Sequence, residues 1–344
     1  MMKDFGALPS MLRSWKVLAG IAVLLAASAV LYVSTRGEEP ENAAVETSAA
    51  DTLALNIICT PTLDCLPFYH ALESGVCDSL GLDLVIRTEV SQFDIDSIMR
   101  RTRLYDGAVL DDARLAHYRS VEGKARDGGQ QGKTAKTAKK GQNGKGKTSA
   151  KSAGDKAEKA SAEKRFYPMP ALTEAVRLEN TWRLVTSGTL RIREVAKMKK
   201  RTVALARFSA EEQCLEQALA KGGLREPDVY KAQINDVALR RMMLDENQVD
   251  AALLPEPYAT MAVVLHGHRL IWSADTTSRA ALYLRTDVLK KPRKQQQMTL
   301  LQKAYRRAAA DLNRRGAHAA DSALIKRYNL PEELIDTLRL PKYN

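Results

Sequence analysis

The chain has 344 residues, of which 45% are hydrophobic, enough for one large or two ordinary domains with buried cores. Its four cysteines form no CxxC pair, and no His/Cys pair has metal-ligand spacing, so the sequence argues against a metal site and gives no sign of a cofactor. The formal net charge is +12, but residues 122–165 supply +8 of it, with 13 Lys/Arg against 5 Asp/Glu. The remaining +4 is ordinary for a solvated surface, so we do not expect nucleic-acid binding.

An uncharged apolar run, Val17–Val33, follows the basic residues Arg13 and Lys16. Its length and its basic flank predict a single membrane-spanning segment of the inner (cytoplasmic) membrane, with the bulk of the chain on the periplasmic side. Ala27-Ser28-Ala29 resembles a signal-peptidase site, so a cleaved signal is the alternative, but the apolar run continues to Val33 and favours a retained anchor. We expect a cytoplasmic N-terminus over 1–16, the anchor over 17–35 and a polar spacer over 36–52.

Short apolar runs alternate with amphipathic stretches from Leu53 onward, which is typical of a parallel sheet with covering helices. Asp64 is placed to cap the first helix. The expected elements, in order, are a strand over Leu53–Cys59, a helix over Leu66–Leu80, a strand over Leu82–Thr88, a helix over Asp94–Arg101 and a strand over Asp106–Leu110.

Residues 121–165 are rich in Lys, Gly, Ala, Ser, Thr and Gln, and no aromatic residue occurs before Phe166. This composition cannot bury a core and predicts a disordered insert. One interpretation is a tolerated low-complexity insertion. The other is a loop that touches anionic lipid, cell wall or nucleic acid through charge alone, since base stacking would need aromatic side chains.

The alternating pattern begins again after the insert, and Ser209 is placed to cap a long helix. The expected strands are Trp182–Ser187, Arg201–Ala206, Tyr230–Ile234, Val249–Leu254 and His268–Trp272, and the expected helices are Ser209–Lys221, Ala238–Leu244, Tyr258–His266, Gln297–Arg314, Ala319–Tyr328 and Pro331–Leu338. We therefore expect an α/β protein with two lobes, each a mainly parallel sheet flanked by helices. Lobe 1 would span 53–120 and 269–344, and lobe 2 would span 182–268.

Several motifs in this order resemble substrate-binding proteins of ABC importers of the nitrate, sulfonate, taurine and thiamine-pyrimidine type, in a Bacteroidetes-like version. They are Thr62–Tyr69 (TLDCLPFY), Gly75, Asp78–Asp83 (DSLGLD), Ser91–Asp94 (SQFD), Arg207–Ala210 (RFSA), Ile234–Asp236 (IND) and Val249–Thr260 (VDAALLPEPYAT). The resemblance implies the type II periplasmic-binding-protein fold, in which two lobes close on a solute like a Venus flytrap and the closed form meets a permease. It also implies a binding protein rather than an enzyme.

The site would lie where strands end, at the mouth of the cleft between the lobes. The candidate ligand-binding residues are Thr60, Thr62, Leu63, Asp64, Cys65, Gln92 and Asp111 in lobe 1, and Arg207, Ser209, Glu256 and Tyr258 in lobe 2. Arg207 and Ser209 suit an anionic or polar atom, whereas Glu256 and Tyr258 suit a cationic or heteroaromatic one. We expect no catalytic and no metal-binding residues.

Other interpretations of these residues stay open. Asp64 and Ser209 could be no more than helix caps, and Arg207 could form a surface or inter-lobe ion pair. Cys65 could be a reactive thiol with a lowered pKa at a helix N-terminus or a structural one, and Cys59 is near enough in sequence to bridge to it.

Two other functions fit the same pattern. The binding fold could serve a membrane-anchored sensor or a cell-envelope interaction protein. Thiamine-pyrimidine synthases also share this fold, but they carry a cysteine-rich iron-binding cluster that the four cysteines here do not form.

Overall fold

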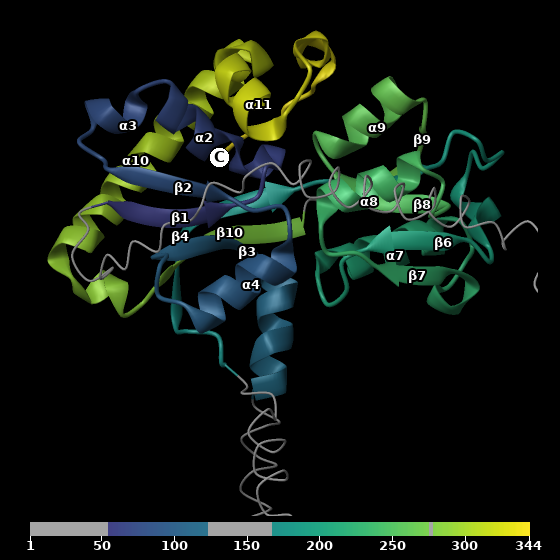
Figure 1. Ribbon diagram of the computed structural model, residues 1–344, viewed down its shortest axis with the longest axis horizontal. Coiled ribbons are helices and arrows are strands. Elements are labelled where there is room, and N and C mark those ends of the chain that lie inside the picture. Colours follow the sequence, from purple (N-terminus) through teal and green to yellow (C-terminus); the bar gives the residue numbers. More distant parts are fainter. Residues whose placement is uncertain (1–53, 123–166, 275–277) are drawn as a thin grey trace, which may run out of the picture. The chain divides into compact units, whose positions relative to one another are not determined.

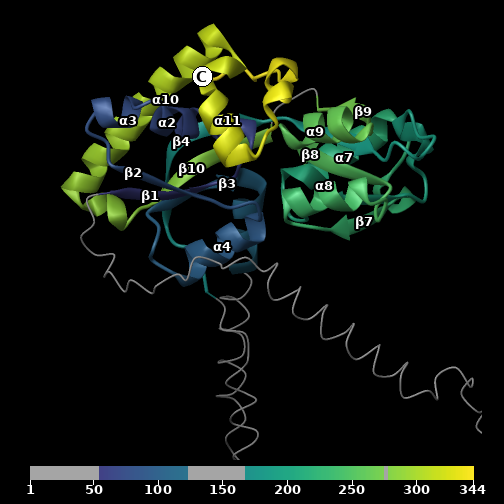
Figure 2. The ribbon, with the colours of Figure 1, turned by 45° about the horizontal axis from the view of Figure 1, so that its top comes forward.

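The computed structural model describes residues 54–122, 167–274 and 278–344. These residues form two separate five-stranded sheets, each covered by helices on both faces (Figure 1). We call the first sheet with its helices lobe 1 and the second sheet with its helices lobe 2. Turning the molecule shows the same two sheets, with α10 and α11 over the first (Figure 2).

The sheet of lobe 1 has the strand order β2-β1-β3-β10-β4. Its strands are β1 (Leu55–Cys59), β2 (Leu84–Thr88), β3 (Gly107–Asp111), β4 (Leu172–Asn180) and β10 (Ser278–Arg285). Strand β1 pairs in parallel with β2 and β3, whereas β10 pairs antiparallel with β3 and β4. The sheet is therefore mixed, and the expectation of a mainly parallel sheet is wrong. That expectation failed because the predicted elements did not include the antiparallel strand β10 or its partner β4.

Helices cover both faces of this sheet because its strand residues point alternately to either side. Leu55 and Ile57 of β1 pack beneath α2 (Leu66–Glu73), whereas Ile58 packs with α4 (Gln92–Arg101) on the opposite face. The first face is also covered by α3 (Val76–Ser79), α10 (Pro292–Arg315) and α11 (Asp321–Tyr328), and the second by a helix over residues 112–122.

Two predicted helices differ in the structure. The helix expected over Leu66–Leu80 breaks into α2 and α3 at Gly75, whose φ of 75° is a left-handed conformation that favours glycine. The last predicted helix is a 3-10 helix, η7 (Glu332–Thr337). The other 3-10 helices of the described residues are η2 (Leu63–Cys65), η3 (Val195–Met198), η4 (Glu226–Asp228), η5 (Val288–Lys290) and η6 (Ala317–Ala320).

The sheet of lobe 2 has the strand order β7-β6-β8-β5-β9. Its strands are β5 (Trp182–Thr186), β6 (Thr202–Leu205), β7 (Tyr230–Gln233), β8 (Ala251–Pro255) and β9 (Arg269–Ser273). Strand β6 is parallel to β7 and β8, but β5 is antiparallel to β8 and β9, so this sheet is mixed as well. Because β9 pairs with β5, it belongs to lobe 2, and the expected return to lobe 1 at residue 269 comes too early.

The two cores of lobe 2 lie on either face of its sheet. Leu253 of β8 packs with α7 (Ala210–Lys221), and its neighbour Leu254 packs with α8 (Val237–Asp245) and α9 (Tyr258–His266). The chain passes between the lobes twice, from β4 to β5 and from β9 to β10.

The predicted anchor over 17–35, its flanks over 1–16 and 36–52, and all but the first two residues of the insert over 121–165 lie outside the described residues. Within the ranges that are described, no helix combines the length and the apolar character needed to span a bilayer.

Candidate functional site

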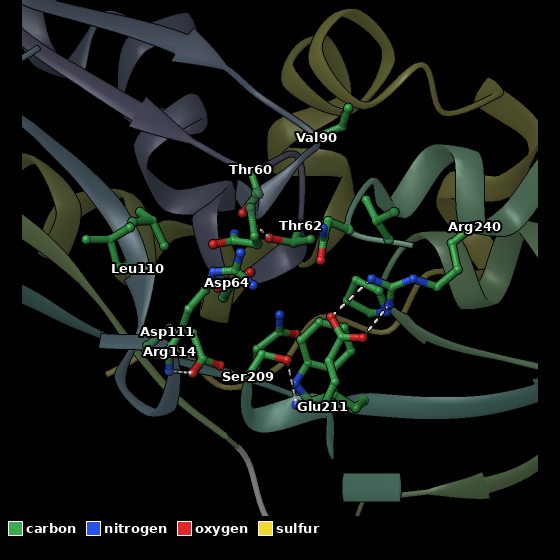
Figure 3. Close-up of a pocket in the computed structure, with 18 residues that line it drawn as sticks. Thr60, Thr62, Asp64, Val90, Leu110, Asp111, Arg114, Ser209, Glu211 and Arg240 are labelled. Carbon is green, nitrogen blue, oxygen red and sulfur yellow. Dashed lines mark hydrogen bonds and ion pairs between the residues drawn. The ribbon is translucent and has the colours of Figure 1, made fainter. Parts of the chain in front are cut away.

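A cavity of about 50 Å³ lies between the lobes and is lined by residues of both (Figure 3). The lining includes Thr60, Thr62, Asp64, Gln92, Asp111, Arg114 and Asn180 of lobe 1 and Trp182, Ser209, Glu211, Asn235 and Arg240 of lobe 2. One water molecule needs roughly 10–15 Å³ of such space, so the cavity has room for a few water-sized groups.

The wall from lobe 1 is built from the residues that follow its three parallel strands. Thr60, Thr62 and Asp64 come after β1, and all three are buried. The hydroxyls of Thr60 and Thr62 lie 3.0 Å apart and share a hydrogen bond. Gln92 begins α4 after β2, and Asp111 ends β3. The carboxyl ends of the strands therefore gather these polar side chains at one edge of the sheet, as in other α/β ligand sites.

The wall from lobe 2 centres on the start of α7. Ser209 is the N-cap of this helix: its Oγ accepts a hydrogen bond from the Glu211 N–H at 3.2 Å and donates one to the Ala206 carbonyl at 2.8 Å. Asn235 immediately precedes Asp236, the N-cap of α8. Both helices thus direct their N-terminal ends toward the cavity.

Both arginines of the lining are neutralised by carboxylates within the protein. Arg240 donates to both oxygens of Glu211, at 2.6 and 3.2 Å, and also to the carbonyls of Ile234 and Leu253. Arg114 forms a buried ion pair with Asp96. Burial raises the pKa of Glu211 and of Asp96, and the paired arginine opposes that rise in each case. Neither arginine therefore brings an unbalanced positive charge to the cavity.

Asp64 and Asp111 differ from these pairs, because neither has an ion-pair partner among the described residues. Burial raises the pKa of Asp64 from 3.8 to about 6, against the lowering effect of the nearby Thr62 hydroxyl. Burial also raises the pKa of Asp111, although its oxygens accept hydrogen bonds from the N–H groups of Arg114 and Ala210. Among the described residues, no basic side chain therefore balances the negative charge that either carboxylate carries in its ionised form.

Three buried oxygens of the lining have no hydrogen-bond partner within the part of the chain that the structure describes. They are Oδ1 of Asp64, Oε1 of Gln92 and Oδ1 of Asn235. Buried polar atoms are almost always hydrogen-bonded in proteins, and an unpaired one costs about 1–3 kcal/mol. Three such acceptors around one cavity indicate a place built for a hydrogen-bond donor.

The two lobes contact each other directly around the cavity. Oδ2 of Asp111 accepts a hydrogen bond from the N–H of Ala210 at 3.1 Å, and the N–H of Leu63 donates to the Glu256 carbonyl at 3.0 Å. Ser91 and Asp236 form an isolated antiparallel bridge. These contacts join the rims of the two lobes, so the structure represents a closed arrangement.

Six of the eleven predicted ligand-binding residues line this cavity: Thr60, Thr62, Asp64, Gln92, Asp111 and Ser209. Leu63 and Glu256 line a second cavity of about 210 Å³, to which Asp64 also contributes. Cys65, Arg207 and Tyr258 line neither. Ligand contact by any of these residues stays a prediction.

The structure excludes some of the alternative roles considered for the predicted residues and supports others. Asp64 does not cap a helix, because Cys65 is the N-cap of α2 and no side chain caps that end. Arg207 forms the surface ion pair considered for it, with its Nε 3.5 Å from Oε1 of Glu212. Tyr258 is buried in the core beneath α9.

The cysteines are all free and buried. Burial raises the pKa of Cys65 well above that of an ordinary thiol, so the lowered pKa considered for a helix N-terminus is wrong, and the structural interpretation fits. Among the described residues, no group of His, Cys, Asp and Glu side chains is arranged to hold a metal ion.

Several lining residues were missed from the sequence. Arg114 lies one turn beyond the end of β3, and Glu211 lies two residues after the Ser209 cap, so their positions near strand and helix ends were available signals. The sequence signal for Arg240 was weaker, since a charged residue in a helix is normally solvated. Only its burial, with 1% of its surface exposed, shows its role.

Solved structures of binding proteins share this fold. The nitrate-binding protein NrtA from Synechocystis aligns with a TM-score of 0.59 at 14% identity, over 82% of this chain and 69% of its own. The ligand-binding component of an ABC-type import system from Staphylococcus aureus, with zinc bound, aligns at 0.57 and 9% identity over 83% and 82%. The alkanesulfonate-binding protein SsuA from Xanthomonas axonopodis, bound to MOPS, aligns at 0.56 and 15% identity over 84% and 83%.

No protein-family model matches the chain, and no curated protein is significantly similar to it in sequence. At these low identities, the structural likeness establishes the fold. The chain therefore has the fold of periplasmic binding proteins of the nitrate and sulfonate type.

Proposed function

We propose that this protein is a non-enzymatic binding protein that captures a small solute in the cavity between its lobes. The observation that carries the proposal is the cavity itself, whose walls come from both lobes and hold three buried acceptors without a partner. A solute that contacted both walls would stabilise the closed arrangement over an open one. The structurally similar proteins are described as binding proteins for nitrate and alkanesulfonate, or as the ligand-binding part of an importer.

Delivery to an ABC permease from the outer side of the cytoplasmic membrane completes the proposal. Two connections between the lobes suit a hinge closure of the kind that such proteins use. The predicted anchor over 17–35 would hold the protein at the membrane where the permease lies.

Thermal-shift screening of the full chain in mild detergent tests the binding step. A bound solute present at 100 times its Kd should stabilise the folded state by about 2.7 kcal/mol and raise the Tm. NMR of the incubated solute should show it unchanged, since no turnover is expected. If no small metabolite raises the Tm, the proposed function is wrong.

A cavity-filling variant tests the position of the site. Ala280 lines the cavity, so Ala280→Leu should abolish the shift caused by any solute that the wild type binds. Ala220→Leu makes the same change on an exposed position of α7 and should leave the shift intact. Equal binding by both variants would place the site elsewhere.

Uptake of the identified solute by cells lacking the protein tests the delivery step. We expect uptake to fall and to return when the full chain is restored. Normal uptake in the deletion strain, with binding intact in vitro, would favour a membrane-anchored sensor.

A further inference from the structure

The chemistry of the cavity lining also narrows the class of solute, given the binding function proposed above. A site that binds an anion needs donors or unbalanced positive charge. Arg240 and Arg114, the two arginines of the lining, are instead held by Glu211 and Asp96. Among the described residues, no lysine or histidine lines the cavity. The basic side chains of this site are thus already engaged within the protein.

The buried polar atoms of the lining that lack a hydrogen-bond partner among the described residues are all acceptors. Asp64 has only 5% of its surface exposed, and its Oδ1 is unpartnered. Gln92 of lobe 1 and Asn235 of lobe 2 each present a buried, unpartnered oxygen. These two amides neighbour the bridge between Ser91 and Asp236, where the lobes meet. A donor group bound here would therefore be contacted from both lobes and would favour closure.

The charge of the cavity lining indicates whether the bound hydrogen-bond donor is cationic or neutral. With the two arginine–carboxylate pairs balanced, the ionised forms of Asp64 and Asp111 give the lining an excess of negative charge. Transfer of an unpaired carboxylate into a buried site is costly unless a cation accompanies it. A hydroxyl would satisfy the acceptors but leave this charge unbalanced, whereas an ammonium group satisfies both requirements and fits a space of about 50 Å³.

We propose that the cavity selects small solutes carrying a protonated amine, with the ammonium group donating hydrogen bonds to Asp64, Gln92 and Asn235. The inference deepens the proposed binding function and depends on it. An anion with no amine would meet excess negative charge and no unengaged basic side chain.

Binding measurements on the full chain test this selection. The panel should contain amines matched with analogues in which a hydroxyl replaces the ammonium group, such as ethanolamine with ethylene glycol, together with polyamines, amino acids, nitrate, ethanesulfonate and magnesium chloride. We expect the Tm to rise with one or more amines and not with their hydroxyl analogues. Binding of nitrate, ethanesulfonate or the inorganic cation alone would overturn the amine inference while leaving the binding function standing. No binding by any solute would overturn both.

Variants of the three acceptor residues test which of them bind the amine. Asp64→Asn should weaken binding of the amine found in the screen by at least about tenfold, because a charged hydrogen bond is lost. Asp78→Asn makes the same change on an exposed residue and should bind as the wild type does. Asn235→Leu and Gln92→Met remove the amide oxygens and should each weaken binding about fivefold or more. Unchanged affinity in all three acceptor variants would overturn the assignment.

Discussion

The carboxylate of Asp111 at the end of β3 accepts a hydrogen bond from the backbone N–H of Ala210, the first residue of α7 in the other lobe, at 3.1 Å. This contact places a negative charge at the positive N-terminal end of a helix and does so only when the lobes are together. Asp111 is thus suited to hold the closed arrangement.

Asp111→Asn should loosen this closure. One amide oxygen can still accept from the Arg114 N–H, but the NH₂ group then faces the donor of Ala210. We expect solute affinity to fall by about five- to tenfold, which corresponds to roughly 1 kcal/mol or slightly more. Small-angle scattering at a fixed solute concentration should show a larger radius of gyration. Identical scattering and affinity in variant and wild type would exclude a role in closure.

Asp64→Asn should stabilise the solute-free protein in a pH-dependent way. The folded pKa of about 6 lies above the ordinary 3.8, so folding favours the protonated acid, and its contribution to stability is lost as the pH rises through this window. Asparagine carries no such cost. The free energy of unfolding of the variant should exceed that of the wild type by about 3 kcal/mol at pH 7.5, with little difference near pH 4.

Urea denaturation at several pH values measures this difference, with Asp78→Asn as the surface control. A difference that does not grow between pH 4 and 7 would contradict the raised pKa of Asp64. The proposed amine should also bind more tightly as the pH rises through about 6, because the ionised carboxylate is the better acceptor.

Arg240→Leu should be among the most damaging changes in lobe 2. It leaves the buried carboxylate of Glu211 without its partner, which typically costs 3–5 kcal/mol. The double variant Glu211→Met with Arg240→Leu should recover much of that loss, because no charge is then left unpaired. Chemical denaturation of both variants measures the effect, and the exposed Arg306→Leu should change stability by less than about 0.5 kcal/mol. If Arg240→Leu alone were as stable as the wild type, the ion pair with Arg240 would not be needed to stabilise the buried Glu211.

Two tyrosines near the C-terminus hold the turn that carries Thr62 and Asp64. The hydroxyl of Tyr343 donates to the Leu63 carbonyl at 2.8 Å, and that of Tyr328 donates to the Thr62 carbonyl at 2.9 Å. Tyr343→Phe should lower the free energy of unfolding by about 1–3 kcal/mol and also weaken solute binding, because the turn loses a fixed contact.

The exposed Tyr230 provides the control for this change, and Tyr230→Phe should alter neither property. If Tyr343→Phe lowered stability but left affinity intact, the C-terminal contact would support the fold and not the geometry of the site.

The sequence pattern predicted the parallel strands, most of which are short apolar runs followed by a helix signal; β7 (YKAQ) is the exception. It missed β4 and β10. Strand β4 (LTEAVRLEN) has no strict alternation, because its register shifts at a bulge and its two buried residues, Ala175 and Leu178, lie three positions apart. The break at Gly75 was also missed, since an amphipathic pattern continues on both sides of it.

For the site, the sequence alone predicted which polar residues follow the ends of the strands. Thr60, Thr62, Asp64, Gln92 and Asp111 were named on that ground and Ser209 as a residue at a helix start, and all six line one cavity in the structure. Glu256 and Tyr258 followed the same rule, but Glu256 faces another cavity and Tyr258 enters a core. A strand end determines where a residue lies along the sheet but not which way its side chain turns.

The sequence by itself determined the two α/β units and the polar turns that end their strands, because periodicity and capping are local properties of the chain. Only the tertiary structure decided which charged and polar groups of the cavity are paired within the protein and which can contact a solute. Asp96 pairs with Arg114 and Glu211 with Arg240, partners that are distant in sequence, whereas one oxygen each of Asp64, Gln92 and Asn235 has no partner among the described residues. Charge balance in a buried site depends on distances through space, and those distances exist only once the chain has folded.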